Sequence, residues 1–170
     1  MRPLAAVALA AVLASCQSTP LASSDAVDTH DTMVRGVNPA ATAIWDVGNA
    51  AGEDSDGWNP ALMNAAAWAK LQGAARELER HSRRMAEAET LFVGDHADTI
   101  DGFASRAEIQ AMIDADPDGF RELARNMAGD AAALVDAATA RDARRSADLV
   151  DGLGAHCGSC HSRYWIEPAS

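Results

Sequence analysis

Apolar residues recur at helical spacing along most of the chain. Between about residues 29 and 52 they lie three and four positions apart, at Met33, Val37, Ala41, Ile44 and Val47. This spacing puts side chains on one face of a helix, so it predicts an amphipathic helix. Pro39 interrupts the segment, and we expect either a kink there or a helix that restarts behind Asn38.

Three further helices are indicated by their start and stop residues. An Asn-Pro pair opens the segment 59–92, and an Asp-Pro pair opens the segment 116–141. The last helix spans roughly 142–163, and residues 93–115 leave room for one short helix. Few Val and Ile residues and no sustained alternation argue against strands. The pattern therefore predicts an all-α fold, an antiparallel four-helix bundle over residues 29–170.

The N-terminus is typical of an export signal. One arginine precedes an uncharged run from Leu4 to Leu13, which is too short to span a bilayer. The following Ala-Ser-Cys resembles the lipobox of bacterial lipoproteins, in which the signal is cut before the cysteine and its thiol carries lipid. We expect a lipoprotein signal peptide over 1–15, lipidation at Cys16 and a flexible tether over 16–28. An ordinary signal with a coincidental cysteine is the alternative. In the lipoprotein family a residue other than Asp after the cysteine indicates the outer membrane, so the resemblance implies that Gln17 directs the chain there, on the periplasmic side.

Charge excludes one class of partner and favours another. The formal net charge is −11, and loss of Arg2 with the signal makes it −12. Nucleic-acid binding needs clustered cations, and the chain has a single lysine, Lys70. We therefore expect protein partners with a basic docking face and no nucleic acid.

The strongest chemical motif lies close to the C-terminus. Residues 157–161 read Cys-Gly-Ser-Cys-His, the attachment sequence for c-type haem. On a helix, residues three and four apart share a face, so Cys157, Cys160 and His161 converge on one object. The two thiols would form thioethers with one covalently bound haem c, and the imidazole would be the proximal iron ligand. A zinc site would need more ligands than these, a thioredoxin-type motif would need an α/β pattern, and a plain disulfide is the remaining alternative.

The position of this motif on the last of four helices resembles the class II cytochromes c, the cytochrome c′ and cytochrome c-556 family. The resemblance covers roughly residues 29–165 in organisation. It implies a four-helix bundle with haem attached to the C-terminal helix. Tyr164 matches an aromatic position of the family, whereas Trp165 stands where the family often has Arg. Thr29 stands where the family often places Arg, four residues before the distal Met.

Function within that family depends on the sixth coordination position of the iron. The resemblance implies that Met33 is the distal axial ligand of an electron carrier. The alternatives are a vacant, five-coordinate iron that binds NO or CO, and ligation by His30. Met33 as a simple core residue is the competing interpretation, since Met packs adaptably. We expect no enzyme activity of the protein itself, and the resemblance allows a homodimer.

Several other residues receive weaker interpretations. Trp45, Trp58 and Trp68 are candidates for walls of the haem pocket, although core packing is the commoner role for a bundle aromatic. The histidines outside the motif, His81, His96 and His156, are expected to be exposed to solvent. Glycines in the last helix suggest either a close approach of the backbone to the macrocycle or fraying, at Gly152, Gly154 and Gly158.

Overall fold

The computed structural model describes residues 26–54, 57–95 and 104–165. Helices account for most of this part of the chain, and they pack side by side as a bundle. In chain order the elements are β1 (Ala26–Asp28), α1 (Thr29–Thr32), η1 (Met33–Val37), α2 (Asn38–Ala51), β2 (Glu53–Asp54), β3 (Gly57–Trp58), η2 (Pro60–Leu62), α3 (Ala65–Glu87), β4 (Thr90–Phe92), α4 (Arg106–Ala115), α5 (Pro117–Ala140) and α6 (Ala143–Tyr164).

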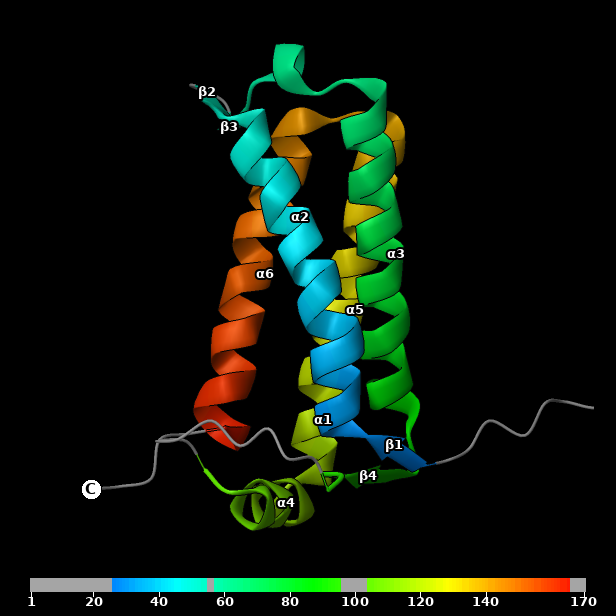
Figure 1. Cartoon of the computed structure of the whole chain (residues 1–170), viewed down its shortest axis with the longest axis vertical. Coiled ribbons are helices and arrows are strands. Elements are labelled where there is room, and N and C mark those ends of the chain that lie inside the picture. The colour runs from blue at the N-terminus through cyan, green and yellow to red at the C-terminus, as the bar shows by residue number, and fades with distance from the viewer. Residues whose placement is uncertain (1–25, 55–56, 96–103, 166–170) are drawn as a thin grey trace, which may run out of the picture.

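Four long helical rods run antiparallel to their neighbours (Figure 1). The first rod consists of α1, η1 and α2 in unbroken succession, and the others are α3, α5 and α6. Helix α3 contacts α5 along its length, while α2 contacts α6 much less. The predicted all-α helical bundle is confirmed, and this uneven packing separates α6 from the first rod at one end.

Capping residues explain where the helices begin. Asp116 and Asp142 cap α5 and α6 through their side chains, as the sequence predicts. The predicted start of the second helix at Asn59 is wrong. Asn59 caps only the short 3₁₀ turn η2, and α3 begins after Asn64, whose Oδ1 accepts hydrogen bonds from the N–H groups of Ala66 and Ala67. A side chain that satisfies two of the first helical donors defines the stronger start.

Two short strand pairs depart from the purely helical expectation. Strand β1 pairs in parallel with β4, so the last three residues of the segment interpreted as a tether belong to the folded part. The Thr29 hydroxyl donates to the carbonyl of Phe92, and the Gly94 N–H donates to the carboxylate of Asp28. The predicted helix to Phe92 therefore ends early, because α3 stops at Glu87 and the chain turns to pair with β1. Pairs of two or three residues are too short to leave an alternating pattern in the sequence.

Pro39 does not restart the first rod, which continues through it as helix. Asn38 has helical dihedral angles of −63° and −47°, and the helix passes through it. The turn before it is a π turn, in which the Asn38 N–H donates to the carbonyl of Met33, five residues back. Proline lacks an N–H and its ring crowds the carbonyl four residues earlier, so a wider turn accommodates it.

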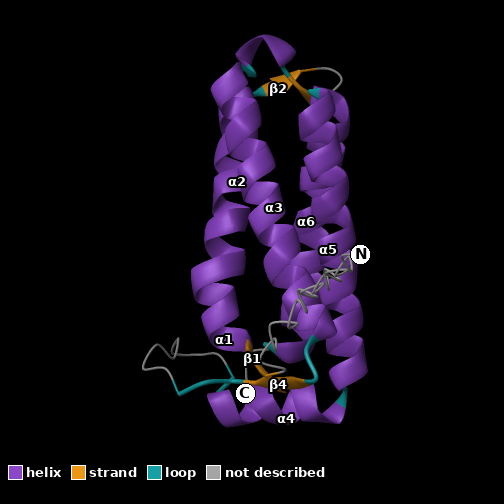
Figure 2. Ribbon diagram, turned by 90° about the vertical axis from the view of Figure 1, so that its right-hand side faces the viewer, coloured by secondary structure: helices purple, strands orange, loops and turns teal. Residues whose placement is uncertain are grey.

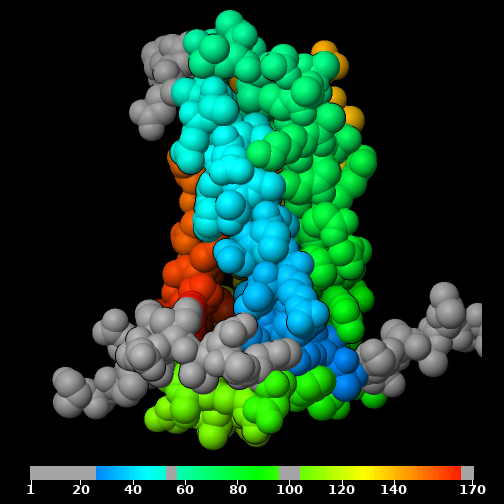
Figure 3. All heavy atoms as spheres, viewed as in Figure 1, coloured from blue at the N-terminus to red at the C-terminus, as the bar shows by residue number. Residues whose placement is uncertain are grey.

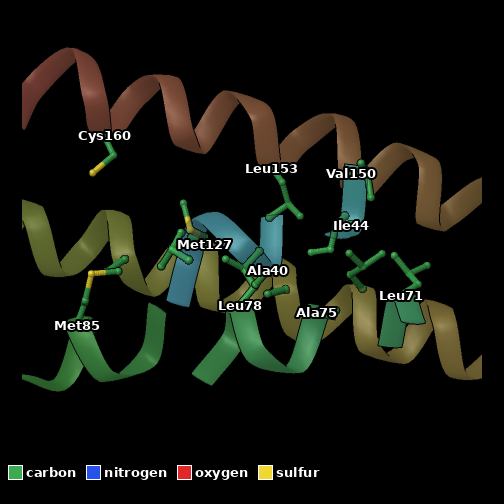
Figure 4. Packing of buried hydrophobic residues seen from close by; sticks show 14 of the residues in the cluster. Ala40, Ile44, Leu71, Ala75, Leu78, Met85, Met127, Val150, Leu153 and Cys160 are labelled. Atoms are coloured by element: carbon green, nitrogen blue, oxygen red, sulfur yellow. The ribbon is translucent and has the colours of Figure 1, made fainter. Parts of the chain in front are cut away.

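Buried apolar side chains run along the bundle, from Leu71 and Val150 to Met85 and Cys160 (Figure 4). In the half of the bundle away from α4, the first rod, α3 and α5 contribute side chains with no exposed surface, among them Ile44, Leu71, Ala75 and Leu134. The many alanines let the helices approach closely, so aliphatic side chains of moderate size fill the space between them. At the other end, β1, β4 and α4 lie together across the base of the bundle (Figure 2). None of the helices in the described ranges is long and apolar enough to span a membrane.

Candidate functional site

A cavity of about 440 Å³ lies between the first rod, α5 and α6 at the α4 end of the bundle. Its volume is in the range of small-molecule and cofactor sites, which is roughly 300–1,000 Å³. The surface is hollowed between the red end of α6 and the blue start of the first rod (Figure 3). Most of the lining side chains are apolar, and they come from the first rod, α4, α5 and α6.

One wall of the cavity carries the Cys-x-x-Cys-His motif. Cys157, Cys160 and His161 all line it, because they lie on adjacent turns of one face of α6. Cys160 is buried, Cys157 is half-buried, and both are free thiols. The structure therefore brings together the three residues that the motif predicts should converge, and their roles in holding haem stay predictions.

The environment of this wall keeps its groups uncharged. Burial raises the pKa of the Cys157 thiol, and it raises the pKa of Cys160 to about 11, with the neighbouring Cys157 contributing. His161 is accessible from the cavity, yet the apolar surroundings lower the pKa of its imidazole. A neutral imidazole is the form that ligates a metal, so the desolvation that lowers this pKa favours ligation.

The opposite wall is the first rod, and it carries Met33. This side chain is half-buried, packs against the core and lines the same cavity as His161. His30, the other distal candidate, lines the cavity as well. The juxtaposition of the first and last rods thus places both sequence-derived distal candidates in the one cavity that contains the motif.

The base of the cavity is formed by α4, which confirms the one short helix expected within residues 93–115. Ile109 and Ile113 of α4 line it, and Ile113 is buried. The start of α4 is a capping box, in which Ser105 accepts from the Glu108 N–H and the Glu108 carboxylate accepts from the Ser105 N–H. That signal, a Ser followed three residues later by Glu, was present in the sequence and would have located the helix.

Helix α6 is fastened at its C-terminal end to the start of α5. The Tyr164 hydroxyl donates to the backbone carbonyl and to the carboxylate of Asp116, at 3.0 and 2.9 Å. The Tyr164 ring packs edge-on against Phe120, and Arg163 forms an ion pair with Asp116. These contacts fix the turn of α6 that follows the motif, so they hold the motif wall in place.

Trp165 packs against the imidazole of the motif. Its ring lies edge-to-face with that of His161, with centroids 4.8 Å apart and planes at 88°. Trp165 also lines the cavity. The residue that replaces the usual arginine of the class II family therefore contacts the predicted proximal ligand directly.

Some predictions for the remaining tryptophans and histidines are confirmed, and others are wrong. Trp45 lines the cavity and is partly exposed, whereas Trp58 and Trp68 are buried core residues, so core packing, the commoner role, is confirmed for these two. His156 is not simply exposed, because its Nε2 lies 2.7 Å from the Asp130 carboxylate. The predicted exposure of His81 is also wrong, since its side chain is only 15% exposed and lies against Gly36. The amphipathic pattern of α3 could not predict this burial, because it depends on Gly36 in the neighbouring rod, which leaves space for the ring.

Other predicted residues remain untested. A Cβ at Gly152, Gly154 or Gly158 would meet no atom of the described chain, so these glycines are not required by packing within the protein. Cys16 and His96 lie outside the described residues.

The donor set and the space around it fit a haem attached to α6. Two thiols and an imidazole lie on one wall of an apolar cavity of suitable volume, with a thioether on the facing wall. Across the ranges that the structure describes, no group of three His, Cys, Asp or Glu side chains is arranged to hold a bare metal ion. The donors therefore suit a macrocycle held by thioether bonds better than a zinc ion.

Comparison with known families gives one match. The family model described as Cytochrome C' matches residues 57–165, which include α3, α5, α6 and the cavity wall with the motif. The match begins after the first rod, so it does not include Met33. No curated protein and no solved structure matches the chain.

Proposed function

We propose that this chain, which belongs to the cytochrome c′ family, carries single electrons with His161 and Met33 as the axial ligands of one haem. Membership of the family makes it a monohaem c-type cytochrome with covalently attached haem c. The ligand pair and the electron-carrier role go beyond the family. They are supported by one observation above all, that Met33 lines the same cavity as His161 although the two residues lie on the first and last rods.

Each residue of the site has a defined part in this proposal. Cys157 and Cys160 would hold the haem through two thioether bonds, each made by adding an S–H bond across a vinyl group, which needs no oxidant. His161 approaches as a neutral imidazole, consistent with its lowered pKa. When bound, the haem supplies a reversible one-electron change at its iron.

Met33 and the apolar lining would tune that electron transfer. A thioether ligand favours ferrous iron and raises the reduction potential relative to a second imidazole. Ile109, Ile113 and Phe120 give the cavity an apolar lining, which would lower the local dielectric constant and reduce solvent reorganisation around the haem. The protein would then exchange electrons through the exposed edge of the site, with no bond made to a substrate.

The test is the ferric spectrum of the holoprotein made with a cytochrome maturation system. We expect a low-spin spectrum in the wild type and a high-spin spectrum in Met33→Ala, because the sixth ligand is removed. Two control variants test whether the spectral change is specific to Met33. Met127→Ala removes the other methionine that lines the cavity, and Met112→Ala removes a partly buried one that does not. Both should stay low-spin, and a high-spin wild type would contradict Met33 ligation.

A second candidate function follows from the same cavity. Val34, Val37 and Ala41 surround Met33 on the first rod with side chains that cannot ligate iron. If neither Met33 nor His30 ligates the iron, the distal position is open beside a largely apolar wall, which favours the binding of small uncharged gases such as NO or CO. A high-spin wild type that binds CO rapidly would support this second candidate.

Location and partners are proposed from the sequence. Proteins of this family lie outside the cytoplasm, and we infer that lipid on Cys16 holds this one at the periplasmic face of the outer membrane. Loss of membrane association in Cys16→Ser would support the anchor. With its excess of acidic residues the protein would dock fastest on a basic partner face, and electron transfer should slow as salt is added.

A further inference from the structure

We propose that the contact between Gly36 and His81 positions Met33 toward the iron. The contact seats the π turn η1 on α3, and Met33 is the first residue of that turn. This inference rests on the proposed function, in which Met33 is the sixth ligand. It makes Gly36 and His81 positioning residues, since neither of them lines the cavity.

The π turn determines which way Met33 faces. One additional residue in a helical turn rotates the preceding segment by roughly 100° about the helix axis, since a regular helix has 3.6 residues per turn. Helix α2 is fixed in the core by Ile44 and Val47, which are 0% and 4% exposed. With α2 fixed, the width of the turn sets the direction of the residues before it. A regular turn in place of η1 would rotate Met33 away from its present direction.

The π turn fits against α3 only because residue 36 has no side chain. A Cβ at Gly36 would lie 2.4 Å from Nδ1, 2.5 Å from Cε1 and 2.6 Å from Cγ of His81. All three distances are far below van der Waals contact, and Cγ is near the base of the side chain. Gly36 has no positive φ, so its backbone does not require glycine. The space beside His81 requires it.

His81 is held in place by packing more than by hydrogen bonds. Its Nδ1 is buried without a hydrogen-bond partner in the described structure. Only Nε2 has polar neighbours, Arg80 at 2.9 Å and the Glu77 carboxylate at 3.7 Å. Leaving a buried nitrogen unsatisfied costs stability, so the position of the ring is explained by the surface it offers to η1. Because the ring is packed against residue 36 on this side, we expect added bulk there to displace the turn.

The test uses two single variants and their combination in the holoprotein. Gly36→Ala should displace η1 and lose most of the low-spin ferric signal, together with the methionine-to-iron charge-transfer band. His81→Ala removes the contact without creating an overlap, so its low-spin fraction should fall less. In the double variant the absent imidazole makes room for the new Cβ, and the low-spin signal should return. If either substitution simply loosened the bundle, combining the two would not restore the low-spin signal.

Three other glycines provide controls. A Cβ at Gly73 or Gly129 meets nothing within 4 Å, so alanine there should leave the spectrum unchanged and raise the midpoint of thermal unfolding, because alanine favours a helix interior. A Cβ at Gly48 would lie 2.9 Å from the Trp58 ring, at the end of α2 remote from the cavity. Gly48→Ala should therefore lower the unfolding midpoint but keep the low-spin spectrum.

The outcomes separate the two proposals. A wild-type spectrum that is high-spin, or that is unchanged in Met33→Ala, overturns the proposed ligand and this inference with it. A low-spin wild type that responds to Met33→Ala but not to Gly36→Ala overturns the positioning role alone. If Gly36→Ala yields no folded holoprotein, the double variant decides. A low-spin double variant supports the Gly36–His81 contact, and a folded high-spin one overturns it.

Discussion

The two ends of the bundle are built from similar residues but packed to different degrees. Near β2 and β3 the four rods interlock, and side chains such as Leu71 and Leu134 have no exposed surface. Near α4 the first rod and α6 stand apart around a cavity of about 440 Å³. A bundle rich in alanine can close tightly where its helices approach and still leave a large apolar space where they diverge. The closed end holds the helices in register, and the open end has room for the prosthetic group.

Removing the two thioether bonds should have the largest effect on the open end. In a Cys157→Ala/Cys160→Ala variant we expect complete loss of covalently bound haem, because no other described cysteine remains. Mass spectrometry of the denatured protein measures this directly. Amide hydrogen exchange should then speed up around the cavity, while the closed end keeps its protection. Equal loss of protection at both ends would show that the closed end does not fold independently of the haem.

Truncating one buried side chain at each end measures the packing difference. Leu134→Ala should lower the free energy of unfolding by about 2–5 kcal/mol, because it creates a new cavity in a closed core. Ile113→Ala in the haem-free protein should cost less, since that side chain already borders an open cavity. Urea unfolding of both variants gives the comparison. If both variants lose the same unfolding free energy without haem, the open end is as well packed as the closed end, and the proposed difference in packing between the two ends is wrong.

The smallest expected change in stability concerns the contacts that hold the C-terminal end of α6 against the start of α5. Tyr164→Phe removes the hydrogen bonds to Asp116 and should cost about 1 kcal/mol at neutral pH. The Tyr164 hydrogen bond, ahead of the Gly119 N–H and Arg163, lowers the pKa of the Asp116 carboxyl below its ordinary value of 3.8. A lowered native pKa stabilises the fold above that ordinary value, and the contribution is lost as the pH falls through the native pKa.

The pH dependence of this variant is therefore specific. The difference in unfolding free energy between the wild type and Tyr164→Phe should narrow in acid, as Asp116 becomes protonated. Thermal unfolding from neutral pH down to below the ordinary pKa of Asp measures it. A difference that stays constant across this range would mean that the Asp116 carboxylate contributes nothing to the fastening.

Local signals in the sequence located the parts of the fold that depend on neighbours a few positions away. Asp116 and Asp142 identified the starts of α5 and α6, since a cap acts on N–H groups within the next turn. The convergence of Cys157, Cys160 and His161 followed from helical spacing alone. The parallel pair of β1 and β4 was not predictable in this way, because each strand is too short to show a pattern and its partner is far away in the chain.

The sequence by itself determined the bundle and the motif on its last helix, because both follow from periodicity and local spacing. It also supplied Met33 and His30 as distal candidates. The tertiary structure decided which rods enclose the cavity, that Trp58 and Trp68 belong to the core, and that His81 lies under the π turn at Gly36. These outcomes depend on how two helices fit side by side. Fit between surfaces distant in sequence is a property of packing that no single segment encodes.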